Sequence, residues 1–190
     1  MALGGGHDYA YPHVAGVLQV EPECLVLNFD AHLDCRPLKN GMNSGTPFRR
    51  LLEEFPRTSL VEIGVQQALN SPHHWKWLQE KGGQIYPLQF IQERGLRYAL
   101  EALEPKGRPL FLSLDMDVFS SAYAPGCSAS WPQGLGVKDF FQCLQPIFEK
   151  FRVLGMGIYE VSPPLDSDFR TCKLAAQILH SAMDFWRASS

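Results

Sequence analysis

Two short acidic clusters, each directly after an apolar run, constrain the fold of this chain more than any other feature. The first cluster, Asp30–Asp34, follows the run Cys24–Phe29, and the second, Asp115–Asp117, follows the run Pro109–Leu114. Apolar runs of this length predict buried strands. The carboxyl edge of an open parallel sheet is where ligand sites form. We therefore expect both clusters to meet at one edge of a parallel sheet.

Strand-like and helix-like segments alternate along the rest of the chain. Further strands are predicted at Leu60–Val65, Gln84–Tyr86 and Val153–Tyr159. The spacing of apolar residues predicts helices over 11–18, 48–55, 72–81, 90–103, 137–151 and 169–186. This alternation predicts an α/β fold, a three-layer α/β/α sandwich around a mainly parallel sheet. Because no linker or repeat interrupts the 190 residues, we expect one domain over residues 1–190.

Composition excludes several classes of protein. The chain is 45% hydrophobic and 19% charged, which is ordinary for a globular domain. A net charge of −3 offers no basic surface for nucleic acid, and no apolar run is long enough to cross a membrane. The five cysteines form no C-x-x-C pair, and their odd number argues against a disulfide framework. We therefore expect a reduced, cytoplasmic setting.

The acids and histidines near the two predicted strand ends have the composition of a metal site. The candidate ligands are His7, Asp30, His32, Asp34, Asp115 and Asp117. In an extended segment, residues at i, i+2 and i+4 point to the same side, so the members of each cluster should converge. Four carboxylates brought together would repel one another unless a cation neutralised them. For any single acid, an ordinary strand-end or N-cap residue is the alternative.

The number and type of ligands indicate the metal. Six protein ligands exceed what one catalytic ion with an open position needs, so two ions are expected. Oxygen and imidazole ligands without thiolate suit Mn²⁺ better than copper or structural zinc. Cys35, beside the first cluster, is interpreted as a small packed residue. The pair His73 and His74 is interpreted as a solvated helix start, because adjacent residues diverge on a helix.

Three segments resemble the signatures of the ureohydrolases, the arginase/agmatinase/formimidoylglutamase family. They are Gly4–His7, Asn28–Asp34 and Ser113–Val118, and the resemblance runs from residue 4 to about residue 186. It implies an arginase-like fold that binds two Mn²⁺ ions. One ion is implied to bind His7, Asp30, Asp34 and Asp115, and the other Asp30, His32, Asp115 and Asp117. Asp30 and Asp115 bridge the ions in this assignment.

The resemblance also implies a mechanism. A metal-bridging hydroxide attacks the carbon of a guanidinium or amidine, and the tetrahedral intermediate then expels an amine. Asp34 is implied to handle the proton of the hydroxide. Glu160, at the end of the last predicted strand, matches the acid that pairs with the amidine nitrogens of the substrate, which is a directional, charge-assisted contact.

Departures from the arginase and agmatinase patterns favour the formimidoylglutamase branch. Ser44 stands where those enzymes usually carry a histidine, and Ala124–Ser130 resembles the formimidoylglutamase version of its loop. Arg36, two residues after the last acid of the first cluster, also fits that branch. The implied reaction is hydrolysis of N-formimidoyl-L-glutamate to L-glutamate and formamide, a step in histidine degradation. Arg36, Asn43 and Ser44 are candidate contacts to its carboxylates; a salt bridge to a metal carboxylate is the alternative for Arg36.

Other functions stay open at the level of sequence. An agmatinase-like or guanidino-acid hydrolase would release urea instead of formamide. A non-catalytic relative would bind metal, or none, and act as an interaction protein. An unrelated two-metal phosphoesterase is disfavoured, because no helix N-terminus or cluster of basic residues awaits a phosphate.

Two further expectations rest on the resemblance alone. Ureohydrolases are often trimers or hexamers, which implies a homo-oligomer. They also carry a strand–helix unit ahead of the Gly-Gly-His motif, which here begins almost at residue 1. We therefore expect the sheet of this chain to lack its first strands.

Overall fold

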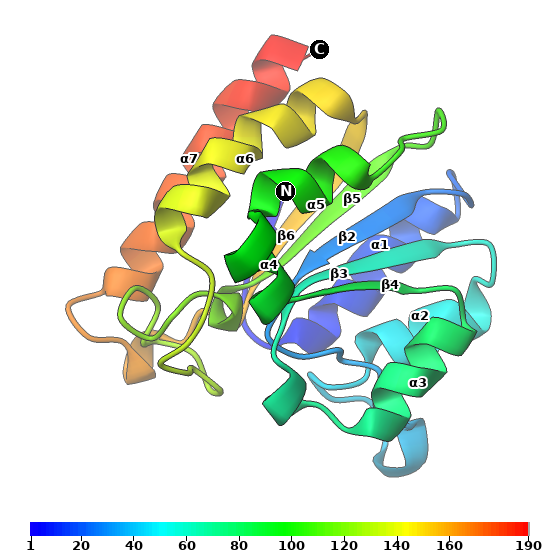
Figure 1. The fold of residues 1–190 in the computed structure, drawn as a ribbon, viewed down its shortest axis with the longest axis horizontal. Helices are drawn as coiled ribbons and strands as arrows, with labels where there is room; N and C mark the ends of the chain where they lie inside the picture. Colours follow the sequence, from blue (N-terminus) through cyan, green and yellow to red (C-terminus); the bar gives the residue numbers. More distant parts are fainter. Residues whose placement is uncertain (190) are drawn as a thin grey trace.

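A parallel sheet forms the centre of the molecule. The computed structural model describes residues 1–189, and within that range it shows a six-stranded sheet with all neighbouring strands parallel. The strands are β1 (Ala2–Leu3), β2 (Leu25–Phe29), β3 (Ser59–Val65), β4 (Gln84–Pro87), β5 (Leu110–Asp115) and β6 (Val153–Tyr159). Their order across the sheet is β1-β6-β5-β2-β3-β4 (Figure 1).

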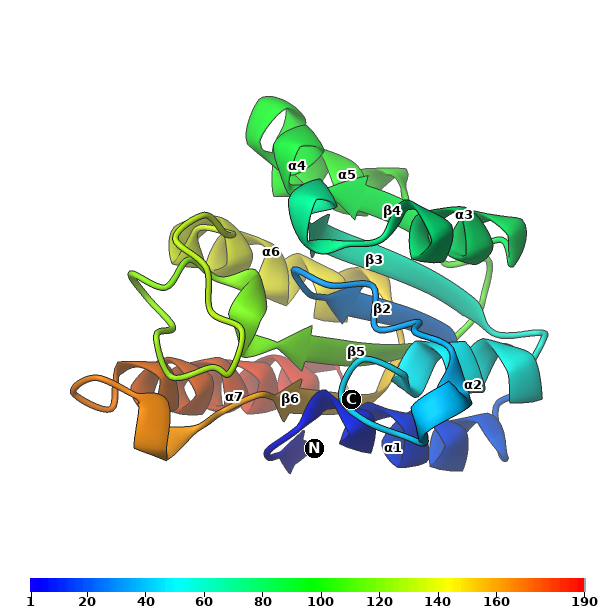
Figure 2. The same cartoon turned by 90° about the horizontal axis from the view of Figure 1, so that it is seen from below.

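Helices cover both faces of the sheet, so the predicted three-layer sandwich is confirmed (Figure 2). One face is covered by α1 (Ala10–Leu18), α2 (Pro47–Glu54) and α3 (Pro72–Glu80). The other is covered by α4 (Leu88–Arg94), α5 (Leu96–Ala102), α6 (Val137–Lys150) and α7 (Arg170–Ser189). No helix within residues 1–189 is long and apolar enough to span a membrane.

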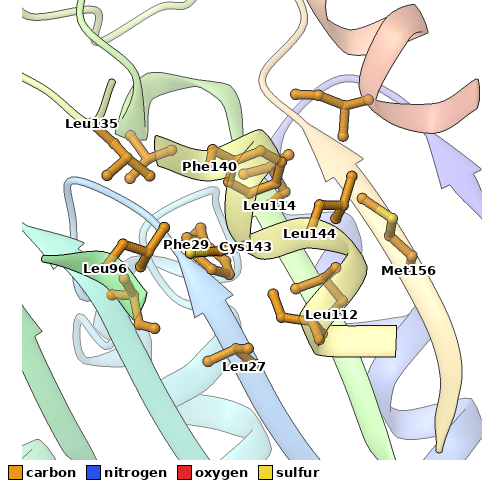
Figure 3. Packing of buried hydrophobic residues seen from close by; sticks show 14 of the residues in the cluster. Leu27, Phe29, Leu96, Leu112, Leu114, Leu135, Phe140, Cys143, Leu144 and Met156 are labelled. Atoms are coloured by element: carbon orange, nitrogen blue, oxygen red, sulfur yellow. The ribbon is translucent and has the colours of Figure 1, made fainter. Parts of the chain in front are cut away.

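Each face has its own apolar core, because successive side chains of a strand point to opposite sides. Leu27 and Phe29 of β2 point toward α6, where Phe140 packs against Phe29 with ring centroids 5.2 Å apart (Figure 3). Val26, which directly precedes Leu27, points to the opposite face and belongs to the second core beneath α1 and α2. The buried strands are therefore mostly apolar on both faces, as expected for a sheet covered on both sides.

The largest difference from the predicted elements is in the helix expected over 90–103. The structure has two helices there, α4 and α5, because Gly95 between them takes a φ of +88°, which is not helical. The short strand β1 was not predicted, since two residues leave no periodic pattern. The other predicted elements agree within about one residue, except that α7 extends to Ser189.

The loop before α7 is held by Asp166. Its Oδ1 accepts hydrogen bonds from the N–H groups of Ser167 (3.0 Å) and Thr171 (3.1 Å), and its Oδ2 accepts one from Cys172 (3.0 Å). Burial alone would raise the pKa of Asp166, but the N–H groups of Cys172 and Thr171 lower it to about 2. The acid thus satisfies free N–H groups in the first turn of the helix.

We expect Asp166→Asn to destabilise the fold at neutral pH, because the charged acceptor of these N–H groups is lost. The expected loss is only about 1 kcal/mol, since the group is partly exposed and its charge is screened. A carboxyl with a lowered folded-state pKa stabilises the fold above its unfolded pKa, near 4, and loses that contribution as pH falls to about 2. Urea unfolding of both proteins between pH 7 and 2 should therefore show a difference that shrinks below pH 4. Asp168→Asn, in the same loop, is the control; an equal loss there would contradict the role of Asp166.

Candidate metal centre

The predicted site residues gather at the carboxyl edge of four neighbouring strands. His7 follows β1, Glu160 follows β6, Asp115 ends β5 and Asp30 follows β2. The chain adds β3 and β4 on one side of β2 but places β5 on its other side. The crevice between β2 and β5 is therefore the topological switch point, where ligands bind in open parallel sheets.

The first ligand group forms around His7. Its Nδ1 lies 2.9 Å from Asp34 Oδ2, 3.0 Å from Asp30 Oδ2 and 3.2 Å from Asp115 Oδ2. None of these contacts has the geometry of a hydrogen bond, so this buried nitrogen has no hydrogen-bond partner among the described residues. A ring nitrogen facing three carboxylate oxygens in this way is the arrangement of ligands around a cation.

The second ligand group consists of Asp30, His32 and Asp117. His32 Nδ1 lies 2.9 Å from Asp117 Oδ2 and 3.5 Å from Asp30 Oδ1. Asp30 thus contributes one oxygen to each group, Oδ2 to the first and Oδ1 to the second. A carboxylate shared in this way is suited to bridge two ions.

The structure corrects the expectation that the cluster Asp30–Asp34 is extended. The strand ends at Phe29, and the chain then bends, with Asp34 at a φ of +41°. As a result Asp34 joins His7, whereas His32 turns toward Asp117. Asp117 likewise lies in a 3₁₀ turn and not in the strand. The residues converge, but through loop geometry and not through the alternation of a strand.

The imidazole of His7 is oriented by contacts on the side of the ring that faces away from the carboxylates. Its Nε2 is 3.0 Å from Ser113 Oγ, a contact that leaves Nδ1 to face the carboxylates. The ring packs against Tyr159, with centroids 4.9 Å apart, and edge-on to Phe48 at 5.4 Å. Gly157 makes room for Tyr159, because a Cβ there would lie 2.0 Å from the phenol oxygen.

Burial and mutual repulsion raise the pKa values of three of the four acids, whereas, despite burial, contacts with His32 and His7 lower the pKa of Asp30. Burial and the charge of Asp30 raise the pKa of both Asp34 and Asp117 to about 7. Burial, with Asp117 and Asp30, also raises the pKa of Asp115 well above its usual value. Burial would lower the pKa of His32, but Asp117 and Asp30 raise it to about 11. Four carboxylates therefore face two imidazoles, and a bound cation would stabilise the acids as anions.

The residues fit a pair of divalent ions. Ligand atoms bound to one ion at about 2.1 Å stand about 3 Å apart, which is the spacing found around His7 Nδ1. Carboxylate and imidazole donors suit Mn²⁺. Cys35 offers no competing ligand: it is fully buried, as predicted for a packed residue, and burial raises the pKa of its thiol.

Glu160 faces the same cavity as the ligands but belongs to neither group. Its Oε1 accepts a hydrogen bond from the N–H of His7 (3.0 Å), and its Oε2 accepts one from Ser128 Oγ (2.8 Å). The residue has a φ of +59°, an uncommon conformation that often marks functional sites. Ser128 was missed by the sequence analysis; only the resemblance of the loop Ala124–Ser130 pointed to its neighbourhood.

Two cavities that share lining residues open beside the ligands. The first, about 60 Å³, is lined by ligands together with Arg36, Ser44, Ser128 and Glu160. The second, about 210 Å³, shares Arg36 with the first and extends to His74. Arg36 forms no ion pair with a carboxylate in the described part of the chain, so the salt bridge considered for it is absent. His74 lines a cavity, which the interpretation of a solvated helix start missed.

Asn43 has a different position from the other predicted substrate contacts. Its Oδ1 accepts a hydrogen bond from the N–H of Gly45 (3.0 Å), and its own N–H donates to Thr46 Oγ1 (3.0 Å). Asn43 therefore shapes the loop that carries Ser44, and it is not among the residues lining either cavity. A contact between Asn43 and substrate stays a prediction.

A parallel α/β sheet that gathers four carboxylates and two imidazoles at its switch point defines a class of metal-binding α/β proteins. Within that class, the chain belongs to the arginase family, whose family model, described as "Arginase family", matches residues 1–184. This agrees with the resemblance found in the three sequence signatures.

The chain is also similar to individual members of the family. Formimidoylglutamase of Bacillus subtilis is 32% identical over 96% of this chain and 60% of its own length. The crystal structure of that enzyme superposes with a TM-score of 0.90, over 96% of this chain and 59% of the enzyme. Formiminoglutamase of Trypanosoma cruzi, solved with Mn²⁺, is 26% identical, with a TM-score of 0.86 over 97% of this chain and 64% of the enzyme. The chain thus spans about three fifths of the length of these relatives.

Proposed function

We propose that this protein binds two Mn²⁺ ions and hydrolyses N-formimidoyl-L-glutamate to L-glutamate and formamide. The observation that carries the proposal is the pair of ligand groups joined by Asp30, with Glu160 beside them. The first group contains the four ligands that the resemblance implies for one ion. The second contains three of the four implied for the other; bridging by Asp115 stays a prediction. Relatives that are named formimidoylglutamase, at 32% identity, support the proposed substrate.

The side chains have distinct tasks in this proposal. Held by the two ligand groups, divalent ions would lower the pKa of a bound water and so supply a nucleophile at neutral pH. The carboxylate of Glu160 accepts N–H groups of the amidinium and places its carbon over the ligands. Asp34, at the wall of the cavity, accepts the proton of the attacking water and returns it to the departing nitrogen.

The far end of the substrate carries two carboxylates, which need cationic or hydrogen-bonding partners. Arg36 lines both cavities, and Ser44 and Glu160 both line the first of them. An exposed guanidinium without an ion-pair partner in the described chain is free to bind a carboxylate through two parallel hydrogen bonds. We propose Arg36 as the main contact to the substrate carboxylates, with Ser44 and Asn43 supporting it from their loop.

The proposal is tested by offering Mn²⁺-loaded protein N-formimidoyl-L-glutamate, agmatine, arginine and 4-guanidinobutanoate in parallel. Formamide from the first substrate alone is the expected result. Urea from any of the others would overturn the proposed substrate but would support the proposed class of reaction, hydrolysis of an amidine or guanidine. Absence of product from all four, with two ions bound, would favour the non-catalytic metal-binding relative.

Substitution of Arg36 tests the proposed substrate contact. We expect Arg36→Ala to raise KM by about 10- to 100-fold, because a charge-assisted contact of about 1.5–3 kcal/mol is lost, and to leave the Mn²⁺ content unchanged. Steady-state kinetics and metal analysis measure the two quantities. Lys39→Ala, in the same loop but outside both cavities, is the control. Loss of Mn²⁺ with an unchanged KM would show that Arg36 supports the ligands instead.

A homo-oligomer and a cytoplasmic location are also part of the proposed function. Both rest on the family resemblance and on composition. Size-exclusion chromatography with light scattering would measure the first directly, and fractionation of the source cells the second.

A further inference from the structure

A row of three polar side chains crosses the sheet directly beneath the ligands. Ser113 of β5, Asn28 of β2 and Glu62 of β3 are partners in the strand register, and all three are fully buried. Residues two positions further along the chain from Ser113 and Asn28 are Asp115 and Asp30. Because side chains two residues apart share a face of the sheet, the row lies next to the ligands on the same face. Ser113 contacts His7, as described above, which leaves Asn28 and Glu62 without an assigned role.

Burial of the Glu62 carboxyl group at this position lowers the stability of the fold, because the group loses its hydration. Its carboxyl group is fully buried in the middle of a strand, and its Oε1 has no hydrogen-bond partner among the described residues. Its one hydrogen bond is accepted by Oε2 from Asn28 Nδ2, at 2.7 Å. An apolar side chain of similar size would suit the interior better, because it carries no desolvation cost. Packing therefore does not account for an acid at this place.

The position of Asn28 connects Glu62 to the metal centre. The same Nδ2 that donates to Glu62 also donates to Asp30 Oδ2, at 3.4 Å. An asparagine amide can turn over and exchange its nitrogen for its oxygen, and Asn28 Oδ1 then would face two carboxylates. The acceptor oxygen of Glu62 opposes that rotation, because it would then face the amide oxygen of Asn28 in place of an N–H donor. It therefore keeps an N–H group of Asn28 directed at Asp30.

We propose that Glu62 and Asn28 are a positioning pair for the metal centre, in which Glu62 holds the Asn28 amide so that its N–H fixes the rotation of the Asp30 carboxylate. The inference rests on the metal centre proposed above. Asp30 gives one oxygen to each ligand group, so a rotation of its carboxylate would displace ligands of both ions. Partners of this kind commonly change metal affinity by about 10- to 100-fold.

The test is the affinity for Mn²⁺, measured by titration calorimetry on the whole chain. We expect Glu62→Leu and Asn28→Leu each to weaken binding by about 10- to 100-fold. Glu62→Gln should keep the affinity of the wild type within a few-fold, because the glutamine oxygen accepts the same hydrogen bond. The double variant should bind no more weakly than Asn28→Leu alone, because Glu62 acts through Asn28.

Thr58→Val is the matched control. Thr58 is also buried, its Oγ1 also has no hydrogen-bond partner among the described residues, and it directly precedes β3 away from the ligands. This variant should bind Mn²⁺ as the wild type does. Thermal unfolding in the presence of a chelator distinguishes a role in fold stability from a role in metal binding. If Glu62 only stabilised the fold, Glu62→Leu would have a lower melting temperature, but the folded variant would bind Mn²⁺ with unchanged affinity.

The outcomes distinguish this inference from the function on which it rests. Wild type that binds Mn²⁺, with Glu62→Leu and Asn28→Leu binding equally well, would overturn the positioning pair alone. Asn28→Leu carries the same test if Glu62→Leu does not fold. Wild type that binds no Mn²⁺ would overturn the metal centre and the pair with it.

Discussion

Replacement of Asp30 by alanine is expected to abolish the binding of both Mn²⁺ ions and the proposed hydrolysis together. Asp30 is the residue common to the two ligand groups, and it offers a different oxygen to each. In the structure, each of the other five ligands belongs to one group only, so replacing any one of them removes a ligand from one group. Metal ions contribute several kcal/mol of transition-state stabilisation, so we expect activity to fall by about 10³-fold or more.

Metal analysis after gel filtration, together with thermal unfolding, measures this effect. With free Mn²⁺ at about 100 times its dissociation constant, binding to the folded state adds about 2.7 kcal/mol, which is about 5–10 °C for a chain of this size. That shift should be present in the wild type and absent in Asp30→Ala. Asp8→Ala is the control, since Asp8 adjoins His7 but belongs to neither ligand group. Two ions retained by Asp30→Ala would refute the shared role.

The second large effect is expected for Glu160→Gln. The change removes the negative charge that pairs with the amidinium of the proposed substrate, and we expect kcat/KM to fall by about 10²- to 10³-fold. The Mn²⁺ content should stay at the level of the wild type, because Glu160 is outside both ligand groups. The fold should also persist: glutamine can still accept from the N–H of His7, and the hydroxyl of Ser128 can turn to accept from the new amide.

Ser128→Ala is compared with Glu160→Gln, because it should have a smaller effect on the same contact. It keeps the charge of Glu160 and frees only its Oε2, so a smaller loss of about 10-fold in kcat/KM is expected. Full activity in Glu160→Gln would show that the charge of Glu160 is not needed for the reaction. Loss of Mn²⁺ in Glu160→Gln would instead mean that Glu160 supports His7, whose N–H it accepts, and has no direct contact with substrate.

Local sequence patterns predicted most of the fold, because burial on both faces leaves a strong signal. The run Val153–Tyr159 carries no charged residue, and Leu25–Phe29 is apolar except for Asn28, while the amphipathic helices carry the period of a helix. The prediction was wrong where one residue overrides the pattern. Gly95 divides α4 from α5 by its positive φ, although the apolar spacing continues through it. The strand β1 depends on hydrogen bonds to β6 and has no local signal at all.

Sequence alone determined which residue types this protein places at its predicted strand ends: the acids of the two clusters and Glu160 directly follow apolar runs. His7 was predicted from the glycine-rich segment before it, since the strand that precedes it was not predicted. Tertiary structure decided how these residues are divided. The bend at Asp34 sends it to His7 and leaves His32 for Asp117, and the pairing of β2 with β5 brings Asp115 beside Asp30 across 85 residues of chain. Glu62, Asn28 and Ser128 became visible only then. Their roles depend on neighbours distant in sequence, and such contacts follow from strand order and loop closure, which no local periodicity records.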